Sequence, residues 1–185
     1  MPQQKSPLLI ALMGPVGSGK SYIAKILAKK LHAIHIRTDD IRVKLREQGK
    51  AYTAARRIAA SVRDQALGRG KSVIADFDAV LPRRQRELAS IAKKYGASFF
   101  LLVINTPEKI ILARLRKKRY TKKELFKNAK EAIRVYFIRK KLHEKGLRAT
   151  PDFAINNDKP LEPQIERILK KIIHHLEDFA VAGQE

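Results

Sequence analysis

The sequence of 185 residues contains no cysteine, which excludes disulfide bonds and thiolate metal sites. It also lacks any apolar run near the roughly 20 residues that a membrane-spanning helix needs. The first residues, MPQQKSP, are polar and include two prolines, so we expect neither a signal peptide nor a membrane anchor there. These features together predict a cytoplasmic protein with no membrane partner.

Acidic residues are scarce, because 18 Asp and Glu stand against 40 Lys and Arg, for a formal net charge of +22. Such a charge attracts polyanions such as nucleic acids and nucleotides. The alternative is a basic surface that is merely solvated and has no specific partner.

Short apolar runs alternate with segments of helical spacing along the chain. The runs cover residues 8–13, 33–37, 72–76, 98–104 and 152–156. Strands that are apolar on both faces suit a buried parallel sheet, and helices between them would cover its two faces. The sequence therefore predicts an α/β fold, a three-layer sandwich with five parallel strands. We expect a single domain over residues 1–185, with flexible ends at residues 1–7 and 179–185.

Residues 109–148 form the most basic segment, with 16 Lys or Arg and 3 Glu. We predict a basic lid here, with a mobile turn near residues 116–120. The pattern from Thr121 to Glu124 fits a capping box and predicts a helix from about Lys122 to Lys145, ended by Gly146. This lid is also the surface most suited to a nucleic-acid partner.

The stretch GPVGSGKS, residues 14–21, has every fixed position of the Walker A pattern and lies between a predicted strand and a predicted helix. Its glycines let backbone N–H groups point at phosphate oxygens, and the following helix adds its positive end. Lys20 can reach the β- and γ-phosphates, and the Ser21 hydroxyl can bind Mg²⁺. The nucleotide-binding residues predicted here are Gly14, Pro15, Val16, Gly17, Ser18, Gly19, Lys20, Ser21 and Tyr22. The alternative is a glycine-rich turn with no ligand.

Two acidic residues follow the predicted third strand. Asp76 ends the apolar run, where a Walker B carboxylate would hold Mg²⁺ directly or through water, and Asp78 points to the same side if the chain stays extended. Either could instead be a surface charge at the strand end or a helix cap.

The stretch RTDDIR, residues 37–42, follows the predicted second strand. Ligands of open parallel sheets lie beyond the carboxyl ends of the strands, so these residues would face the Walker A loop. A carboxylate there could accept a proton from an attacking hydroxyl, and Arg42 could bind an anionic group. The alternative is that Thr38 or Asp39 simply caps a helix through Leu45.

The basic run ARLRKKRY, residues 113–120, offers cations that could close over a transferring phosphoryl group. Most of these side chains would be solvated, and one or two would suffice for chemistry. The Asn-Lys-x-Asp guanine motif is absent, which favours ATP over GTP, and the five histidines show no metal-ligand spacing.

Four stretches in this order, GPVGSGKS, TDDIR, VIADFDAVLPRRQR and NTPEKIILARLRKKR, resemble P-loop kinases of the AAA-type ATP-binding group. Within that group they are similar to the polynucleotide 5′-kinase domain and to zeta-toxin-like kinases. The resemblance covers about residues 8–119 and the last strand and helix. It departs at Phe77-Asp78, where small or amide residues are more common, and at Tyr22, where threonine is common.

The resemblance implies roles for individual residues. It implies that Lys20 and Ser21 contact the phosphates and the metal, that Asp39 is the general base, and that Arg42 binds a phosphate of the acceptor. It places the lid cation at Lys118 or Arg119, and it matches Arg114 to the arginine that ends the lid-side helix pattern.

The sequence as a whole predicts an ATP- and Mg²⁺-dependent phosphotransferase. We expect the acceptor to be a hydroxyl, most plainly a 5′-hydroxyl of a nucleic acid or of a nucleotide-like molecule. Two alternatives stay open: a small-molecule kinase of the same fold, and a nucleotide-binding switch that transfers no phosphate to a substrate.

Overall fold

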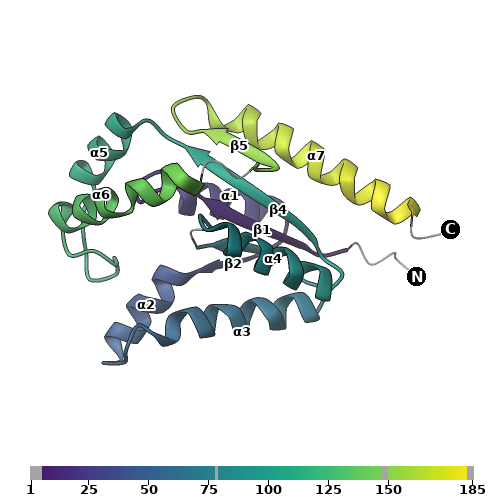
Figure 1. The fold of residues 1–185 in the computed structure, drawn as a ribbon, viewed down its shortest axis with the longest axis horizontal. Coiled ribbons are helices and arrows are strands. Elements are labelled where there is room, and N and C mark those ends of the chain that lie inside the picture. Colours follow the sequence, from purple (N-terminus) through teal and green to yellow (C-terminus); the bar gives the residue numbers. More distant parts are fainter. Residues whose placement is uncertain (1–5, 78, 147–149, 183–185) are drawn as a thin grey trace.

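A five-stranded parallel sheet with helices on both faces forms the centre of the molecule (Figure 1). The computed structural model describes residues 6–77, 79–146 and 150–182. The strands lie in the order β2-β3-β1-β4-β5. Their bounds are β1 Leu8–Met13, β2 Ile34–Arg37, β3 Val73–Asp76, β4 Ser98–Asn105 and β5 Phe153–Asn156. The predicted three-layer α/β fold is therefore confirmed, and each strand ends within one residue of its predicted bounds.

The helices cover the sheet as two outer layers and a lid. Their bounds are α1 Lys20–Lys30, α2 Thr38–Glu47, α3 Ala54–Gly68, α4 Pro82–Lys94, α5 Glu108–Lys117, α6 Ala129–Gly146 and α7 Leu161–Ala182. One core cluster joins one face of β1 and β4 to α1 and α7, and a second joins the opposite face to α3 and α4. All six residues of β1 are buried, as expected for a central strand covered on both sides. Helix α7 runs to Ala182, so it includes residues 179–182 of the predicted flexible tail.

Helices α5 and α6 pack on each other and carry the basic lid. Ile111 and Leu115 of α5 are buried against Ala132 and Tyr136 of α6. The two helices are also joined at Glu108, whose carboxylate accepts a hydrogen bond from the Tyr136 hydroxyl at 2.8 Å. This small core fixes the helical part of the lid to the rest of the domain.

The predicted helix start at Lys122 is wrong, because residues 121–128 form turns and α6 begins at Ala129. The Thr121 hydroxyl accepts a hydrogen bond from the backbone of Lys123, so the predicted capping box does not form. The Asn128 side chain instead accepts from the Glu131 backbone at 2.9 Å, and the Glu131 carboxylate reaches back to the Lys127 backbone. The helix starts at this second capping site, because the residues that follow it form the apolar face that packs on α5.

The topology brings three loops together at one edge of the sheet. Strands β1, β2 and β3 are parallel neighbours, and Arg37 at the end of β2 pairs in register with Asp76 at the end of β3. The Walker A loop follows β1, so the three predicted site segments meet where parallel α/β sheets bind their ligands. No helix among the described residues is long and apolar enough to cross a membrane.

Candidate active site

The Walker A loop is a cradle whose backbone only glycine can adopt at two positions. Gly17 and Gly19 have φ angles of +82° and +94°, in the left-handed region. A Cβ on Gly17 would lie 3.0 Å from the Leu115 side chain, and a Cβ on Gly19 would lie 2.2 Å from the Asn157 amide nitrogen. Because Gly19 is also the residue before α1, this curl directs the loop into the positive end of that helix.

Three side chains from outside the loop hold the carbonyl of Ser18. Asn157 Nδ2 donates to it at 2.5 Å, Thr106 Oγ1 at 2.9 Å and Arg114 Nη1 at 3.5 Å. Arg114 also donates to the Asn157 carbonyl at 3.1 Å. Arg114, predicted from the lid pattern, thus supports the cradle from α5 while it lines the cavity described below.

Sequence reasoning missed Thr106 and Asn157. Thr106 follows β4 and Asn157 follows β5, so both lie beyond the carboxyl ends of strands on the side of β1 away from β3. The signal was present, because any polar residue directly after a strand of a parallel sheet is a candidate for this edge.

Lys20 and Ser21 are the first two residues of α1, directly after the cradle. Lys20 Nζ donates to the carbonyls of Gly14 at 2.5 Å and Pro15 at 3.0 Å, so its ammonium lies across the cradle. The Ser21 hydroxyl, at the start of α1, hydrogen-bonds the buried carboxylate of Asp76. A hydroxyl and a carboxylate therefore meet beside the cradle.

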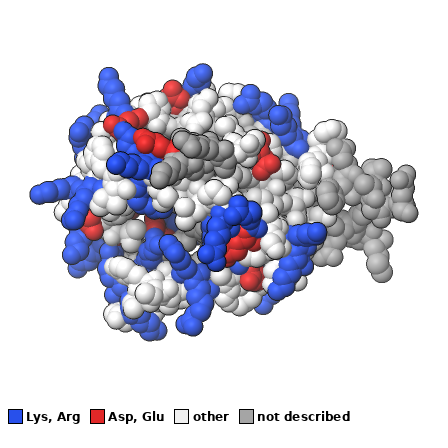
Figure 2. Space-filling view, in the orientation of Figure 1, with Lys and Arg blue, Asp and Glu red and all other residues white. Residues whose placement is uncertain are grey.

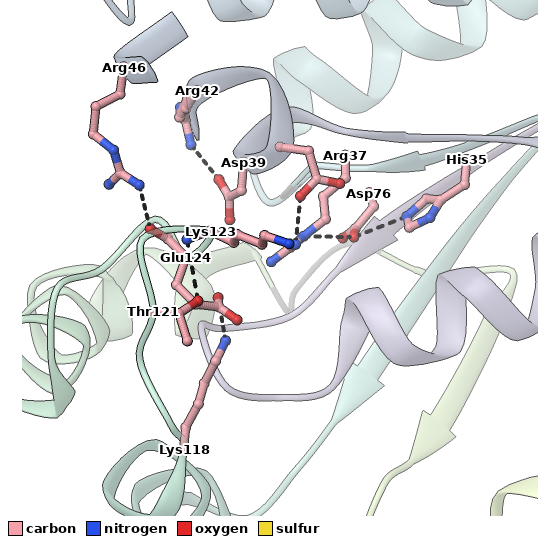
Figure 3. Close-up of polar contacts among 11 residues, drawn as sticks. His35, Arg37, Asp39, Arg42, Arg46, Asp76, Lys118, Thr121, Lys123 and Glu124 are labelled. Carbon is pink, nitrogen blue, oxygen red and sulfur yellow. Dashed lines mark hydrogen bonds and ion pairs between the residues drawn. The ribbon is translucent and has the colours of Figure 1, made fainter. Parts of the chain in front are cut away.

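Asp76 is held by residues of β2 (Figure 3). Its Oδ2 lies 3.2 Å from His35 Nε2 and 3.8 Å from Arg37 Nε. Burial raises the pKa of the Asp76 carboxyl, but hydrogen bonds from His35 and Ser21 and the charge of Lys20 outweigh it, so the pKa lies below its ordinary value. His35 was not predicted to take part. The second predicted carboxylate, Asp78, lies outside the described residues.

Asp39 and Arg42 form an ion pair one helical turn apart, with Arg42 Nη1 2.8 Å from Asp39 Oδ1. Helix α2 starts at Thr38, as the helix-start alternative expects, with Asp39 and Asp40 in its first turn, but no side chain makes a capping hydrogen bond. Asp40 instead pairs with Arg37 at 2.8 Å. Of the two adjacent aspartates, only Asp39 lines the cavity.

The lid turn, residues 118–128, is attached to α2 (Figure 3). The Arg46 guanidinium donates to the backbone carbonyls of Lys122, Glu124 and Leu125, the last two at 3.0 Å and 3.4 Å. Within the turn, Lys118 Nζ lies 2.7 Å from the Glu124 carboxylate. Of the two predicted lid cations, Lys118 lines the cavity, and Arg119 is not among the lining residues.

One cavity of about 790 Å³ joins all of these parts. It is lined on one side by the Walker A residues Pro15, Val16, Gly17, Gly19, Lys20, Ser21 and Tyr22. Asp39, Arg42 and Asp76 also line it, as do Lys118 and its neighbours in the lid turn. Residues of α3, of the end of β3 and of the start of α4 form a further part of the lining, called the far wall below. Gly14 and Ser18 lie in the cradle but do not line the cavity. The arrangement can hold a phosphorylated ligand and place a carboxylate beside it.

The comparisons with known proteins agree with this geometry. Residues 9–137 match the AAA domain family, and the chain belongs to it. No curated protein sequence matches the chain. Among solved structures it is similar to a gluconokinase from Sinorhizobium meliloti 1021, with 18% identity, a TM-score of 0.59, and 96% of this chain and 98% of the other covered.

Two further structures are similar over most of their length. A sugar kinase from Janibacter sp. HTCC2649 is 19% identical, with a TM-score of 0.58 and coverage of 89% of this chain and 93% of the other. A shikimate kinase from Acinetobacter baumannii, in complex with shikimate, is 17% identical, with a TM-score of 0.52 and coverage of 92% and 96%. The chain therefore has the fold of the P-loop kinases.

Proposed function

We propose that this protein is an ATP-dependent phosphotransferase that moves the γ-phosphate to a hydroxyl of a small molecule. The observation that carries the proposal is the cavity, because the Walker A residues and the Asp39–Arg42 pair line it together. A cradle alone would fit any nucleotide-binding protein. A carboxylate in the same cavity supplies what transfer to a hydroxyl needs, namely a group that can accept its proton.

The cradle suits a triphosphate and the neighbouring groups suit Mg²⁺. Gly17 and Gly19 let the loop curl so that backbone N–H groups can face phosphate oxygens, and a Cβ at either would also intrude on Leu115 or Asn157. Ser21 and Asp76 offer two oxygen donors, the kind of sparse set that Mg²⁺ uses together with substrate phosphates. The described residues contain no group of three or more acidic or histidine side chains able to hold a metal. Bound there, the ion would neutralise charge on the β- and γ-phosphates.

Asp39 is the proposed base. As the acceptor oxygen attacks the γ-phosphorus and the bond to the β-phosphate bridging oxygen breaks, the hydroxyl proton passes to the Asp39 carboxylate. The 2.8 Å pair with Arg42 fixes the rotamer of that carboxylate in the cavity. Lys20 from the cradle and Lys118 from the lid are the cations that would stabilise the charge of the transferring group.

We favour a small acceptor over a nucleic acid. Arg46 joins α2 to the lid turn, and several residues of that turn line the cavity. On the face shown in Figure 2, Lys and Arg side chains lie at many separate places rather than along one groove. The solved structures of the same fold described above are named as kinases of sugars, gluconate and shikimate.

A transfer assay with γ-labelled ATP tests the proposal. The panel contains sugars, sugar acids and other small alcohols, a 5′-hydroxyl oligonucleotide, and water alone. We expect label on a small alcohol and none with Lys20→Ala, since that change deletes the cation fixed in the cradle. Label on the oligonucleotide alone would restore the nucleic-acid prediction, and tight ATP binding with no labelled product from any acceptor would favour the switch.

A further inference from the structure

The far wall of the cavity carries more positive charge than its acidic residues can balance. It comprises residues of α3, of the end of β3 and of the start of α4. The arginines that line this wall, the end of β2 and α2 are Arg37, Arg42, Arg56, Arg83 and Arg84.

Three of these arginines already have carboxylate partners. Arg42 pairs with Asp39 at 2.8 Å, and Arg37 pairs with Asp40 at 2.8 Å. Arg84 lies 2.6 Å from the Glu87 carboxylate, and its guanidinium also lies over the Phe77 ring, 5.2 Å from the centroid. Their charge is therefore balanced, and their position is fixed, within the protein itself.

The other two, Arg56 and Arg83, are exposed residues that line the cavity, and neither makes a hydrogen bond or ion pair with any residue that the structure describes. Arg56 comes from α3 and Arg83 from α4, so two separate elements each present an unbalanced guanidinium to one cavity. A guanidinium offers up to five N–H donors in a planar fork that matches an oxyanion.

Stability of the helices does not explain these two positions. Arg56 is the third residue of α3 and Arg83 the second of α4, and neither first turn contains an acidic residue. A cation in the first turn is repelled by the positive end of the helix. An anionic partner in the cavity would remove that repulsion.

Apolar groups line the same wall as the charges. Ala59 and Val80 are buried, and Phe77 and Leu81 complete an apolar surface on the same wall. A ligand that fits this wall has a carbon skeleton as well as an anionic end.

We propose that the acceptor is a small alcohol that carries an oxyanion, a carboxylate, sulfate or phosphate group, which Arg56 and Arg83 bind together. This assignment rests on the proposed function, because it places the acceptor in the half of the cavity beyond Asp39. It differs from the role that the family resemblance implies, since the geometry gives Arg42 to Asp39 and leaves the binding of the anion to the other two arginines.

Inorganic sulfate is the probe that tests the site without knowledge of the acceptor. The full chain is first saturated with AMPPNP and Mg²⁺, which fill the cradle, and sulfate is then titrated by calorimetry. We expect saturable sulfate binding that the double variant Arg56→Gln/Arg83→Gln weakens by at least tenfold, the size of one lost charge-assisted hydrogen bond. AMPPNP affinity should not change.

The matched control is Arg57→Gln/Arg86→Gln, which removes the same charge from the same two helices at residues that do not line the cavity. It should leave sulfate binding intact. Equal loss in both double variants would show a general effect of surface charge and overturn the site, as would sulfate binding that neither variant alters or no sulfate binding at all. AMPPNP binding and label transfer are measured separately, so failure of the anion site is distinguishable from failure of the kinase proposal.

Matched acceptors identify the anion. Gluconate is compared with glucitol for the carboxylate, and glycerol 3-phosphate with glycerol for the phosphate, in the label-transfer assay. We expect the charged member of a pair to be the better substrate, and Arg56→Gln to raise its KM with little change in kcat. Equal use of a charged alcohol and its neutral counterpart would contradict the proposal.

Discussion

Substitution of Gly19 by alanine should destabilise the protein through two effects that the structure separates. The first is the backbone, because a φ of +94° costs an alanine about 1–2 kcal/mol. The second is contact, because the new Cβ would lie 2.2 Å from Asn157 Nδ2, which must then leave the Ser18 carbonyl that it holds at 2.5 Å. Loss of a buried hydrogen bond adds about 1–3 kcal/mol. We therefore expect the free energy of unfolding to fall by about 2–5 kcal/mol, with weaker AMPPNP binding.

Gly49→Ala is the matched control for the backbone effect. Gly49 has a φ of +66°, and a Cβ there would meet nothing within 4 Å. It should lose only the backbone component, about 1–2 kcal/mol in urea unfolding. In a double-mutant cycle, Asn157→Ala should cost less in the Gly19→Ala background than in the wild type. Equal losses for the two glycines, with additive behaviour in the cycle, would refute the claim that Asn157 fixes the cradle.

Three other predictions follow from the site. Ser21→Ala and Asp76→Asn should each raise the Mg²⁺ concentration needed for half-maximal transfer; an unchanged requirement in both would misplace the metal. Arg46→Gln, compared with Lys44→Gln on the same helix, should increase protease cleavage and amide exchange in the lid turn, because it removes the donor to three lid carbonyls. Asp76 has a lowered pKa, so the folded protein binds fewer protons than the unfolded chain; its contribution to stability is present above the unfolded pKa and is lost as pH falls through the folded one. Asp76→Asn should make the free energy of unfolding, measured by urea titration at a series of pH values, depend less on pH in the acid range. An unchanged pH dependence would contradict this prediction.

The central sheet was predictable because its strands are short apolar runs that only a fully covered parallel sheet can bury. The runs at β1 and β4 are buried on both faces, so the sequence did not have to show which face of each strand points to the core. The cradle was predictable for a related reason. Its glycines are required by local backbone geometry, which the sequence carries directly.

The sequence alone could not decide between two similar local patterns for the start of a helix. Thr121 and Asn128 both precede a glutamate by three residues, and each can start a helix. Packing of α6 on α5 selects Asn128, and that contact lies between segments that the local pattern does not relate.

The contacts of His35 and Asn157 arise from strand order. His35 meets Asp76 because β2 lies beside β3, and Asn157 meets the cradle from the other side of β1. Strand order is a long-range property, so neither contact could be read from neighbouring residues.

The measurement that tests the account most directly is kcat of Asp39→Asn with the best acceptor of the label-transfer panel. We predict a fall of about 10²–10⁴-fold, the size expected for loss of a general base, with AMPPNP affinity unchanged. Asp40→Asn, which removes the neighbouring carboxylate outside the cavity, should have a much smaller effect. A turnover of Asp39→Asn equal to that of the wild type, in a folded protein that still binds AMPPNP, would contradict the claim that this cavity transfers phosphate to a hydroxyl held at Asp39.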